Sequence, residues 1–163
     1  FFFNMAGIGF DAHISAAFAN DKTRGLQGYV KTIVKEISSY QPQTYQIEID
    51  GVKYTRDAFV ISIANSSQYG NNVFISPASS TSDGLLDVCI IKTFPLYKIP
   101  VLVYQMLRAK THQSTMVEII RGKHIVITRN KEDSIHLDGE SFLMDKEITI
   151  EVLPLALNII TNN

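Results

Sequence analysis

The chain has 163 residues, of which 45% are hydrophobic and 19% charged, so a packed core is expected and disorder is not. A formal net charge of −1 argues against a nucleic-acid-binding surface as the main function. The single cysteine, Cys89, excludes an internal disulfide framework and indicates a reducing compartment. No apolar run approaches the ~18 residues of a membrane span, and the apolar start lacks the basic leader of a signal peptide.

The first quarter of the chain predicts a strand followed by two helices. Residues 1–6 are an apolar run typical of a buried strand, and residues 7–12 (GIGFDA) match the G-x-G-x-x-A dinucleotide pattern. A Rossmann unit would continue with a parallel strand ending in an acid, whereas a second helical pattern and a hairpin turn follow here. We therefore interpret the glycines as a tight turn from strand into helix. Helices are expected over 11–20 and 29–40.

Beyond residue 42 the pattern changes to β, with one helical interruption. Asp50-Gly51 is a hairpin-turn sequence between alternating segments. A helix is expected over 96–110, where Pro100 either kinks it or marks its true start. This helix is interpreted as packing on a sheet, and the alternative is a helix that lies on a membrane surface. Strands are expected at 45–49, 52–54, 58–64, 73–75, 85–92, 116–120, 124–128, 134–137, 147–153 and 156–161.

Many short strands separated by turn signals predict two packed antiparallel sheets, either a sandwich or a flattened barrel. The helices are few and lie near the start of the chain and at 96–110. The predicted fold class is therefore α+β, mainly β: an antiparallel two-sheet sandwich with a few peripheral helices.

Two acidic clusters carry the residue types that phosphate and metal chemistry needs. Asp83 ends a loop of small residues, where carboxylate and carbonyl oxygens suit Mg²⁺, although a turn aspartate also bonds its own backbone. Asp138-Gly139-Glu140 places two carboxylates around a glycine, so that one can accept a proton while the other holds a metal. The alternative for the second cluster is a plain hairpin turn, because Asp-Gly between apolar runs is a strong turn signal.

Four motifs follow one another over essentially the whole chain. They are residues 3–12 (FNMAGIGFDA), 65–70 (NSSQYG) leading to Pro77-Ala78, 82–88 (SDGLLDV) and 137–140 (LDGE). In this order and spacing they resemble the C-terminal domain of soluble diacylglycerol kinases and their bacterial lipid kinase relatives. That family also includes sphingosine and ceramide kinases and, more distantly, the NAD kinases.

The resemblance implies that residues 1–163 form the C-terminal β-sandwich domain of a two-domain lipid kinase. The N-terminal nucleotide-binding domain, with its Gly-Gly-Asp-Gly-Thr motif, would lie outside this chain, which would be inactive alone. The implied reaction is ATP- and Mg²⁺-dependent phosphorylation of a lipid hydroxyl, diacylglycerol to phosphatidic acid in the simplest case. The enzyme would be cytoplasmic and peripheral at the membrane, and a homodimer is compatible with it. Two alternatives stay open: NAD-kinase-like phosphotransfer to a soluble substrate, and a non-catalytic β-rich binding module.

The resemblance also implies roles for individual residues. Asp138 matches the general base for the lipid hydroxyl, and Glu140 matches the carboxylate in the magnesium and water network around ATP. Asp83 matches a ligand of a second, structural magnesium, which backbone carbonyls of Ser80 and Leu85 would complete.

Four further residues of the first motif are candidates for the substrate cleft: Asn4, Gly7, Gly9 and Asp11. The chain departs from the family pattern at two places. Ser82 stands where relatives often carry another acid, and Asn71-Asn72 stand where relatives are richer in glycine. These departures bear on the structural magnesium and leave Asp138 and Glu140 untouched.

Overall fold

A computed structural model gives the fold of the protein and describes residues 1–19 and 26–158. Within these two ranges the chain forms antiparallel strands and three α-helices, with two short 3-10 helices, η1 and η2. The elements in chain order are β1 (Met5–Gly9), α1 (Phe10–Ala19), α2 (Leu26–Glu36), β2 (Gln43–Ile49), β3 (Val52–Ala64), β4 (Gln68–Gly70), β5 (Val73–Phe74), β6 (Leu86–Lys92), η1 (Leu96–Lys98), α3 (Ile99–Leu107), η2 (Thr111–Gln113), β7 (Val117–Gly122), β8 (His124–Thr128), β9 (Asp133–Leu137), β10 (Glu140–Met144) and β11 (Glu147–Glu151).

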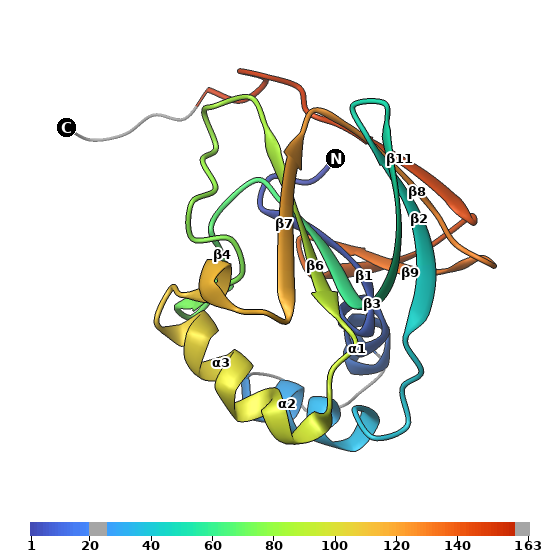
Figure 1. Cartoon of the computed structure of the whole chain (residues 1–163), viewed down its shortest axis with the longest axis vertical. Coiled ribbons are helices and arrows are strands. Elements are labelled where there is room, and N and C mark those ends of the chain that lie inside the picture. The colour runs from blue at the N-terminus through green and yellow to red at the C-terminus, as the bar shows by residue number, and fades with distance from the viewer. Residues whose placement is uncertain (20–25, 159–163) are drawn as a thin grey trace.

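Nine of these strands form one antiparallel sheet that is nearly closed into two facing layers, and the helices gather at one end of it (Figure 1). Its strand order is β10-β9-β1-β3-β2-β8-β11, and β6 and β7 extend from β3. β4 and β5 form a small separate ribbon. The predicted fold class, a mainly β sandwich with a few peripheral helices, is confirmed.

β3 belongs to both layers of the sandwich. Its first half, from residue 52 to 58, pairs with β2, and its second half pairs with β1 and β6. A β-bulge between Ala58 and Val60 shifts the register against β6. Because a bulge changes which side chains face inward, Tyr54 and Ala58 face the space between the layers before it, and Ile61 and Ile63 face that space after it.

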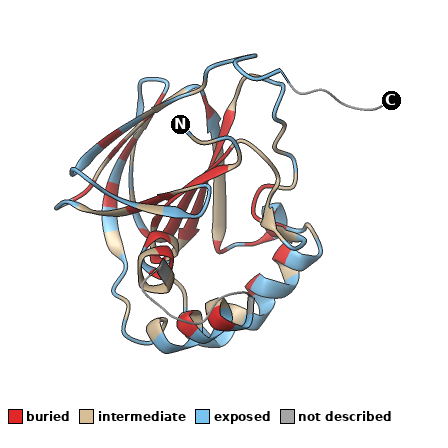
Figure 2. Ribbon diagram, turned by 180° about the vertical axis from the view of Figure 1, so that it is seen from behind, coloured by how far each residue is buried: buried red, intermediate tan, exposed pale blue. Residues whose placement is uncertain are grey.

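Two hydrophobic cores lie on the two faces of the layer that contains β1, β3 and β6. The inter-sheet core lies between the layers, and each fully buried isoleucine in it contributes roughly 1.5–3 kcal/mol. The helix-side core lies between the opposite face and the helices, and Figure 2 shows both as red bands along the strands. The inter-sheet core contains Ala6, Ile8, Tyr45, Ile47, Ile49, Ala58, Ile61, Ile63, Leu86, Val88, Ile90, Ile125, Ile127, Ile135 and Ile148. The helix-side core contains Met5, Phe10, Ile14, Val60, Ala64, Ile75, Cys89, Ile91, Leu102, Met106 and Met116.

The helices differ in detail from the sequence-based expectation. α2 ends at Glu36 rather than at residue 40. Ile33 of α2 and Ile37 just after it pack on the core, while Val30 and Val34 are exposed. α3 starts at Ile99, so that Pro100 sits in its first turn, where a missing N–H costs nothing. Residue 20, the expected end of the first helix, lies outside the described residues.

Three strand predictions need correction. The expected segments 52–54 and 58–64 are one continuous strand, β3. β10 (Glu140–Met144) was not expected, because four of its five residues lie exposed or nearly so and its alternation is weak. The strand expected over 156–161 is wrong for 156–158, which have no regular structure, and 159–161 lie outside the described residues.

Candidate active site

Asp138 and Gly139 are the two central residues of the hairpin turn between β9 and β10. Leu137 pairs with Glu140 across the turn, and both central residues have positive φ, 50° for Asp138 and 92° for Gly139. These angles are typical of the two-residue turn that follows the twist of a hairpin, for which Asp-Gly is a preferred sequence. The interpretation of Asp-Gly as a turn is therefore right, and the side chain of Asp138 has a second role.

The Asp138 carboxylate binds the backbone where β1 begins. It accepts N–H bonds from Phe3 at 2.7 Å, from Met5 at 2.8 Å and from Asn4 at 2.9 Å. Burial alone would raise the pKa of Asp138, but these three donors and the charge of His136 outweigh burial and lower the pKa below 3.8. A carboxylate offers about four acceptor positions, so one remains unused by these three donors.

His136 and Asp11 form a buried pair beside this turn. The His136 side chain is only 5% exposed, and its Nε2 lies 2.7 Å from Asp11 Oδ2. Its Nδ1 lies 3.4 Å from the backbone nitrogen of Gly139, whose N–H it can accept only while the ring is neutral. Burial lowers the pKa of His136, but the hydrogen bond and charge of Asp11 and the charge of Asp138 outweigh it, so the pKa lies above 6.5. The pair links α1 to the turn that carries Asp138.

The two glycines of the first motif have structural roles that differ. A side chain on Gly7 would overlap His136 Nε2 and Asp11, so glycine leaves the space in which the buried pair meets. Gly9 has φ 89°, and a Cβ there would lie 2.7 Å from the carbonyl oxygen of Phe59. The expected tight turn from strand into helix is therefore found at Gly9, at the far end of β1 from Asp138.

Asn4 joins the first motif to the second. Its carbonyl oxygen accepts N–H bonds from Asn65 at 3.0 Å and Ser66 at 3.3 Å, and its side-chain oxygen accepts the Ser66 hydroxyl. The Asn65 amide in turn donates to the carbonyl of Phe3 at 2.7 Å. Residues separated by sixty positions thus hold the segment that the Asp138 carboxylate binds.

An apolar cavity opens beside the turn. Its volume is about 580 Å³, and it lies at the mouth of the space between the two layers. A smaller hollow of about 250 Å³ adjoins it and is lined by Phe1, Phe3, Leu137, Asp138, Glu140 and Phe142. Both share Phe1, Phe3 and Leu137, so the two hollows adjoin, and the smaller one borders both carboxylates. The larger cavity is lined mainly by Phe1, Phe2, Ile135, Met144, Ile148 and Leu153.

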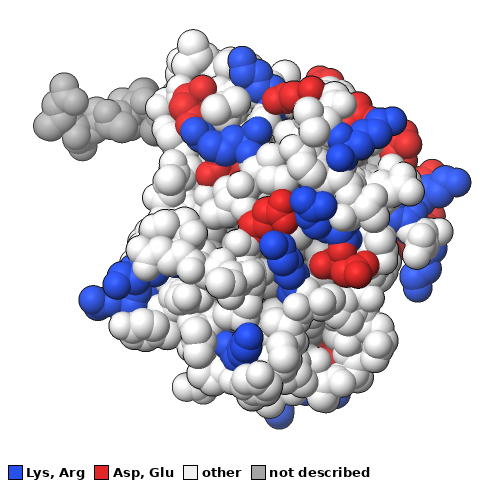
Figure 3. Space-filling model, viewed as in Figure 1, with Lys and Arg blue, Asp and Glu red and all other residues white. Residues whose placement is uncertain are grey.

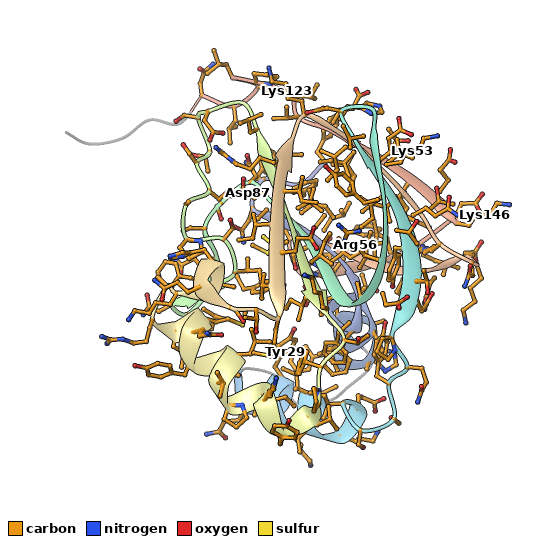
Figure 4. The ribbon with its side chains drawn as sticks, in the orientation of Figure 1. Tyr29, Lys53, Arg56, Asp87, Lys123 and Lys146 are labelled. Atoms are coloured by element: carbon orange, nitrogen blue, oxygen red, sulfur yellow. The ribbon has the colours of Figure 1, made fainter. Side chains whose placement is uncertain are left out.

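Asp83 lies in a different cluster, with Arg121 and Asp87. The guanidinium of Arg121 bonds Asp83 Oδ2 and, at 2.8 Å, the carboxylate of Asp87, which is 2% exposed. Figure 4 shows Asp87 on β6 beside β7. Asp83 also accepts the N–H of Leu85 at 3.0 Å, and the Ser80 hydroxyl meets that of Ser82 at 3.3 Å. Backbone donation, then Arg121, lower the pKa of Asp83 against the effect of burial.

These contacts do not fit the structural magnesium that the resemblance implies. Arg121 offsets one of the two negative charges of Asp83 and Asp87, and its guanidinium occupies the carboxylate oxygens that would face a divalent cation, which it would also repel. In the part of the chain that the structure describes, no three acidic, histidine or cysteine side chains are grouped to hold a metal. We therefore derive no step through a metal at Asp83, and its role as a ligand stays a prediction that requires Arg121 to move.

The two acidic clusters lie at the same end of the sheet. Asp87 pairs in register with Ala64, and Ala64 pairs with Met5, whose N–H binds Asp138. Neighbouring strands are about 4.8 Å apart, which puts Asp87 roughly 10 Å from Met5. The fold thus brings together Asn4, Gly7, Asp11, Asp138 and Glu140, while Gly9 and the Asp83 cluster lie apart from that group.

Sequence reasoning assigned no role to His136 or Arg121. A histidine two residues before Asp138 in a predicted strand lies on the same face as the turn aspartate, and this alternation was the available signal for His136. Arg121 gave no local signal, because its partners are more than thirty residues away.

Residues 4–161 match the family described as the YegS C-terminal NAD kinase beta sandwich-like domain. The chain belongs to this family. The protein named probable lipid kinase YegS-like of Shewanella frigidimarina is 26% identical over 162 residues, covering 98% of this chain and 52% of that protein. The diacylglycerol kinase of Mycobacterium tuberculosis is 23% identical over 166 residues, with the same coverage of 98% and 52%. The resemblance to a lipid kinase C-terminal domain is therefore confirmed at the level of the family.

The solved structures support the same fold. A diacylglycerol kinase from Bacillus anthracis has a TM-score of 0.60 and 22% identity, over 94% of this chain and 50% of that one. The chain spans about half the length of the curated relatives that it matches. Among the helices that the structure describes, none has the length and apolar character needed to cross a membrane.

Proposed function

We propose that the full-length protein is a lipid kinase that transfers the γ-phosphoryl group of ATP to diacylglycerol and forms phosphatidic acid. The observation that carries this proposal is the apolar cavity that leads to Asp138 and Glu140. An acyl chain needs apolar walls, and its hydroxyl needs a proton acceptor where those walls end. The names of the relatives support the same activity.

In the proposed reaction Asp138 is the general base. The lipid hydroxyl oxygen forms a bond to the γ-phosphorus, the bond from that phosphorus to the ADP oxygen breaks, and the hydroxyl proton passes to the Asp138 carboxylate. The three backbone donors fix that carboxylate in place and leave an acceptor position free. Its lowered pKa makes it a weak base, which suits a loose transition state in which the proton leaves late.

Glu140 is the residue of this chain that fits a magnesium ion at the ATP phosphates. Its side chain is exposed and makes no hydrogen bond or ion pair with the described residues, so both oxygens are free for a hard cation. Bound Mg²⁺ would neutralise charge that develops on the phosphates. The proposal assigns most of the ATP contacts to a nucleotide-binding domain outside residues 1–163, and places the enzyme in the cytoplasm, peripheral at the membrane.

Phosphotransfer by the full-length protein tests this proposal. Labelled ATP is offered with diacylglycerol in mixed micelles and, separately, with sphingosine and with NAD as acceptors. We expect labelled phosphatidic acid, formed only with a divalent cation. Transfer to NAD alone would replace the lipid with a soluble substrate, and transfer to no acceptor would favour a binding module.

Residues 1–163 alone provide a second test. We expect them to bind Mg-ATP poorly and to transfer no phosphate, because the chain lacks a glycine-rich loop that cradles phosphates. Calorimetry measures this directly. A micromolar Kd, about −8 kcal/mol, would show that this fold holds the nucleotide by itself.

A further inference from the structure

α3 presents an apolar surface that the rest of the described chain leaves uncovered. Leu102 and Met106 are its buried side chains, and they face the helix-side core. The opposite side carries Val101 and Tyr104, which are 52% and 58% exposed, and Tyr97 of the preceding η1, which is 77% exposed, continues it. Their spacing of four and three residues puts them on one stripe. The α3 face consists of Leu96, Tyr97, Val101, Val103, Tyr104 and Leu107, all largely exposed.

A surface helix of a globular protein normally exposes charged and polar residues to water. α3 has no charged residue among its nine, and its polar Gln105 is half-buried, while several apolar side chains are exposed. Contiguous exposed apolar surface marks a site of interaction with a partner or a membrane. The face therefore needs an occupant, and the charges around it indicate which kind.

The segment of the chain that contains the α3 face carries only positive charges. From residue 88 to 117 the chain has four basic residues and no acidic one, although the whole chain carries −1. Lys98 lies at the start of α3, and Arg108 and Lys110 follow its end, all three exposed and without an ion pair to the described residues. In Figure 3 the surface over α3 is white and blue, whereas the acidic side chains gather over the strands.

We propose that the α3 face docks the protein on the surface of an anionic lipid bilayer. A helix of this kind lies in the interface plane, with its apolar side at the boundary between head groups and acyl chains. Tyrosines suit that boundary because one end of the ring is apolar and the other is polar. Lys98, Arg108 and Lys110 then reach the lipid phosphates from both ends of the helix.

α2 extends the same end of the molecule. Figure 1 and Figure 2 both place α2 and α3 at the end away from the chain termini. Val30 and Val34 of α2 are exposed there, with the basic side chains of Lys31 and Lys35 next to them, and Lys35 also pairs with Glu36 at 3.3 Å. The pattern of exposed apolar residues flanked by lysines thus recurs beside the α3 face, as a bilayer surface requires. The inference rests on the proposed function only in that a lipid kinase must reach its substrate in a membrane.

Vesicle flotation of the full-length protein tests the proposal without ATP or diacylglycerol. Vesicles of phosphatidylcholine are compared with vesicles that also contain phosphatidylglycerol. Three variants are measured: Val101→Ser with Tyr104→Ser, Arg108→Gln with Lys110→Gln, and Val52→Ser with Lys53→Gln. The last is the matched control, because it removes one exposed apolar and one basic side chain at the β2–β3 turn, away from α3 (Figure 4).

We expect wild type to float with anionic vesicles and the apolar variant to bind roughly tenfold or more weakly. Each basic side chain near an anionic surface contributes about fivefold, so the Arg108 and Lys110 variant is expected to lose most of its preference for phosphatidylglycerol. The control is expected to bind like wild type. Phosphotransfer to a soluble short-chain diacylglycerol should be unchanged in all three variants, which separates failure of docking from failure of the proposed function.

Four results would overturn the proposal. The first is equal binding of wild type and the apolar variant, and the second is no binding of wild type to anionic vesicles. The third is a homodimer that the apolar variant dissociates in sedimentation while vesicle binding stays intact, which would assign the face to a second copy of the chain. A lower melting temperature of the apolar variant, together with unchanged vesicle binding, would likewise assign the face to packing within the protein.

Discussion

Two hairpin turns of this protein have the same sequence and nearly the same geometry. Asp50-Gly51 joins β2 to β3 with φ values of 49° and 84°, and Asp138-Gly139 joins β9 to β10 with 50° and 92°. Each aspartate also fastens a distant segment through backbone donors. Asp50 accepts the N–H groups of Lys123 and His124, just as Asp138 accepts those of residues 3–5.

The two turns differ in what lies around them. Asp138 has the buried His136–Asp11 pair on one side and the apolar cavity on the other, together with a second carboxylate at Glu140. Asp50 has an exposed hairpin on one side and lines neither cavity. Local sequence therefore accounts for each turn, whereas long-range packing accounts for the backbone donors that each aspartate binds and for the surroundings that make Asp138 a candidate site. This pair of turns provides matched controls.

The largest expected effect is on catalysis by Asp138→Asn. Asparagine keeps the turn but cannot take a proton at neutral pH, so we expect kcat of the full-length protein to fall about 10²–10⁴-fold. Asp50→Asn should leave kcat within about threefold, under 1 kcal/mol of barrier. Lipid phosphorylation at saturating ATP measures both.

Thermal melts of the two asparagine variants complete this test. The structure shows that Asp138 also binds three N–H groups, so Asp138→Asn is expected to lose stability, by about 1 kcal/mol at this exposed turn. Activity is therefore compared well below both melting temperatures. If kcat fell equally in Asp138→Asn and Asp50→Asn, or did not fall in Asp138→Asn, then Asp138 would not be the general base.

A glycine lies near each turn, and replacing that glycine by alanine is expected to have the next largest effect. A Cβ on Gly7 would overlap His136 and Asp11, and one on Gly122 would overlap Ile49 and approach Asp50. Both changes are expected to cost about 1–3 kcal/mol of stability by overpacking. Only Gly7→Ala should also lower kcat, because it displaces the pair beside Asp138. Urea unfolding and kinetics together test this, and a loss of kcat in Gly122→Ala as large as in Gly7→Ala would contradict it.

The stability that His136 contributes is expected to depend on pH. Its pKa is raised in the folded protein, so its ionic bond to Asp11 is fully present below about pH 6.5, the ordinary pKa, and is lost as the pH rises through the folded value. We expect His136→Gln to lose about 1–3 kcal/mol on the acidic side and less on the alkaline side. His124→Gln, at a half-exposed pair with Glu151 beside the Asp50 turn, should change little at either pH.

This prediction is tested by the melting temperatures of wild type, His136→Gln and His124→Gln, measured below and above neutral pH. If the loss of stability in His136→Gln grew as the pH rises, His136 would be neutral in the folded protein.

The smallest effect is expected at Asp83. Because Arg121 balances its charge, Asp83→Ala should lower the melting temperature slightly and leave the response to Mg²⁺ unchanged from wild type. Melts with and without Mg²⁺ measure this. A magnesium-dependent rise in wild type that is lost in Asp83→Ala would show that Arg121 gives way to a metal, as the family resemblance implies.

The sequence was informative where one short segment decides the structure. Alternation located β2, the Asp-Gly pairs located two turns, and the start of α3 matches one of the two alternatives left open for Pro100. It was weaker where distant residues decide. β10 gave no clear pattern because its side chains are mostly exposed.

The same limit applies to the candidate site. Asp138 and Glu140 adjoin in sequence and were named from it, but Arg121 meets Asp83 only through the pairing of β6 with β7. His136 meets Asp11 only because β9 pairs with β1, across more than a hundred residues. Neither contact leaves a local pattern. The carboxylates could be named from sequence, whereas the partners that set their charge balance could not.

The position of β1 between two late strands sets an order for folding during synthesis. Ala6 pairs with Ile63 on one side and with Leu137 on the other. At a synthesis rate of about 5–20 residues per second, the second edge of β1 stays unpaired for roughly 4–15 s after the first has closed. A nascent chain would expose this apolar edge to other strands throughout that interval, so the ribosome-bound half-sheet is the species most in need of a chaperone.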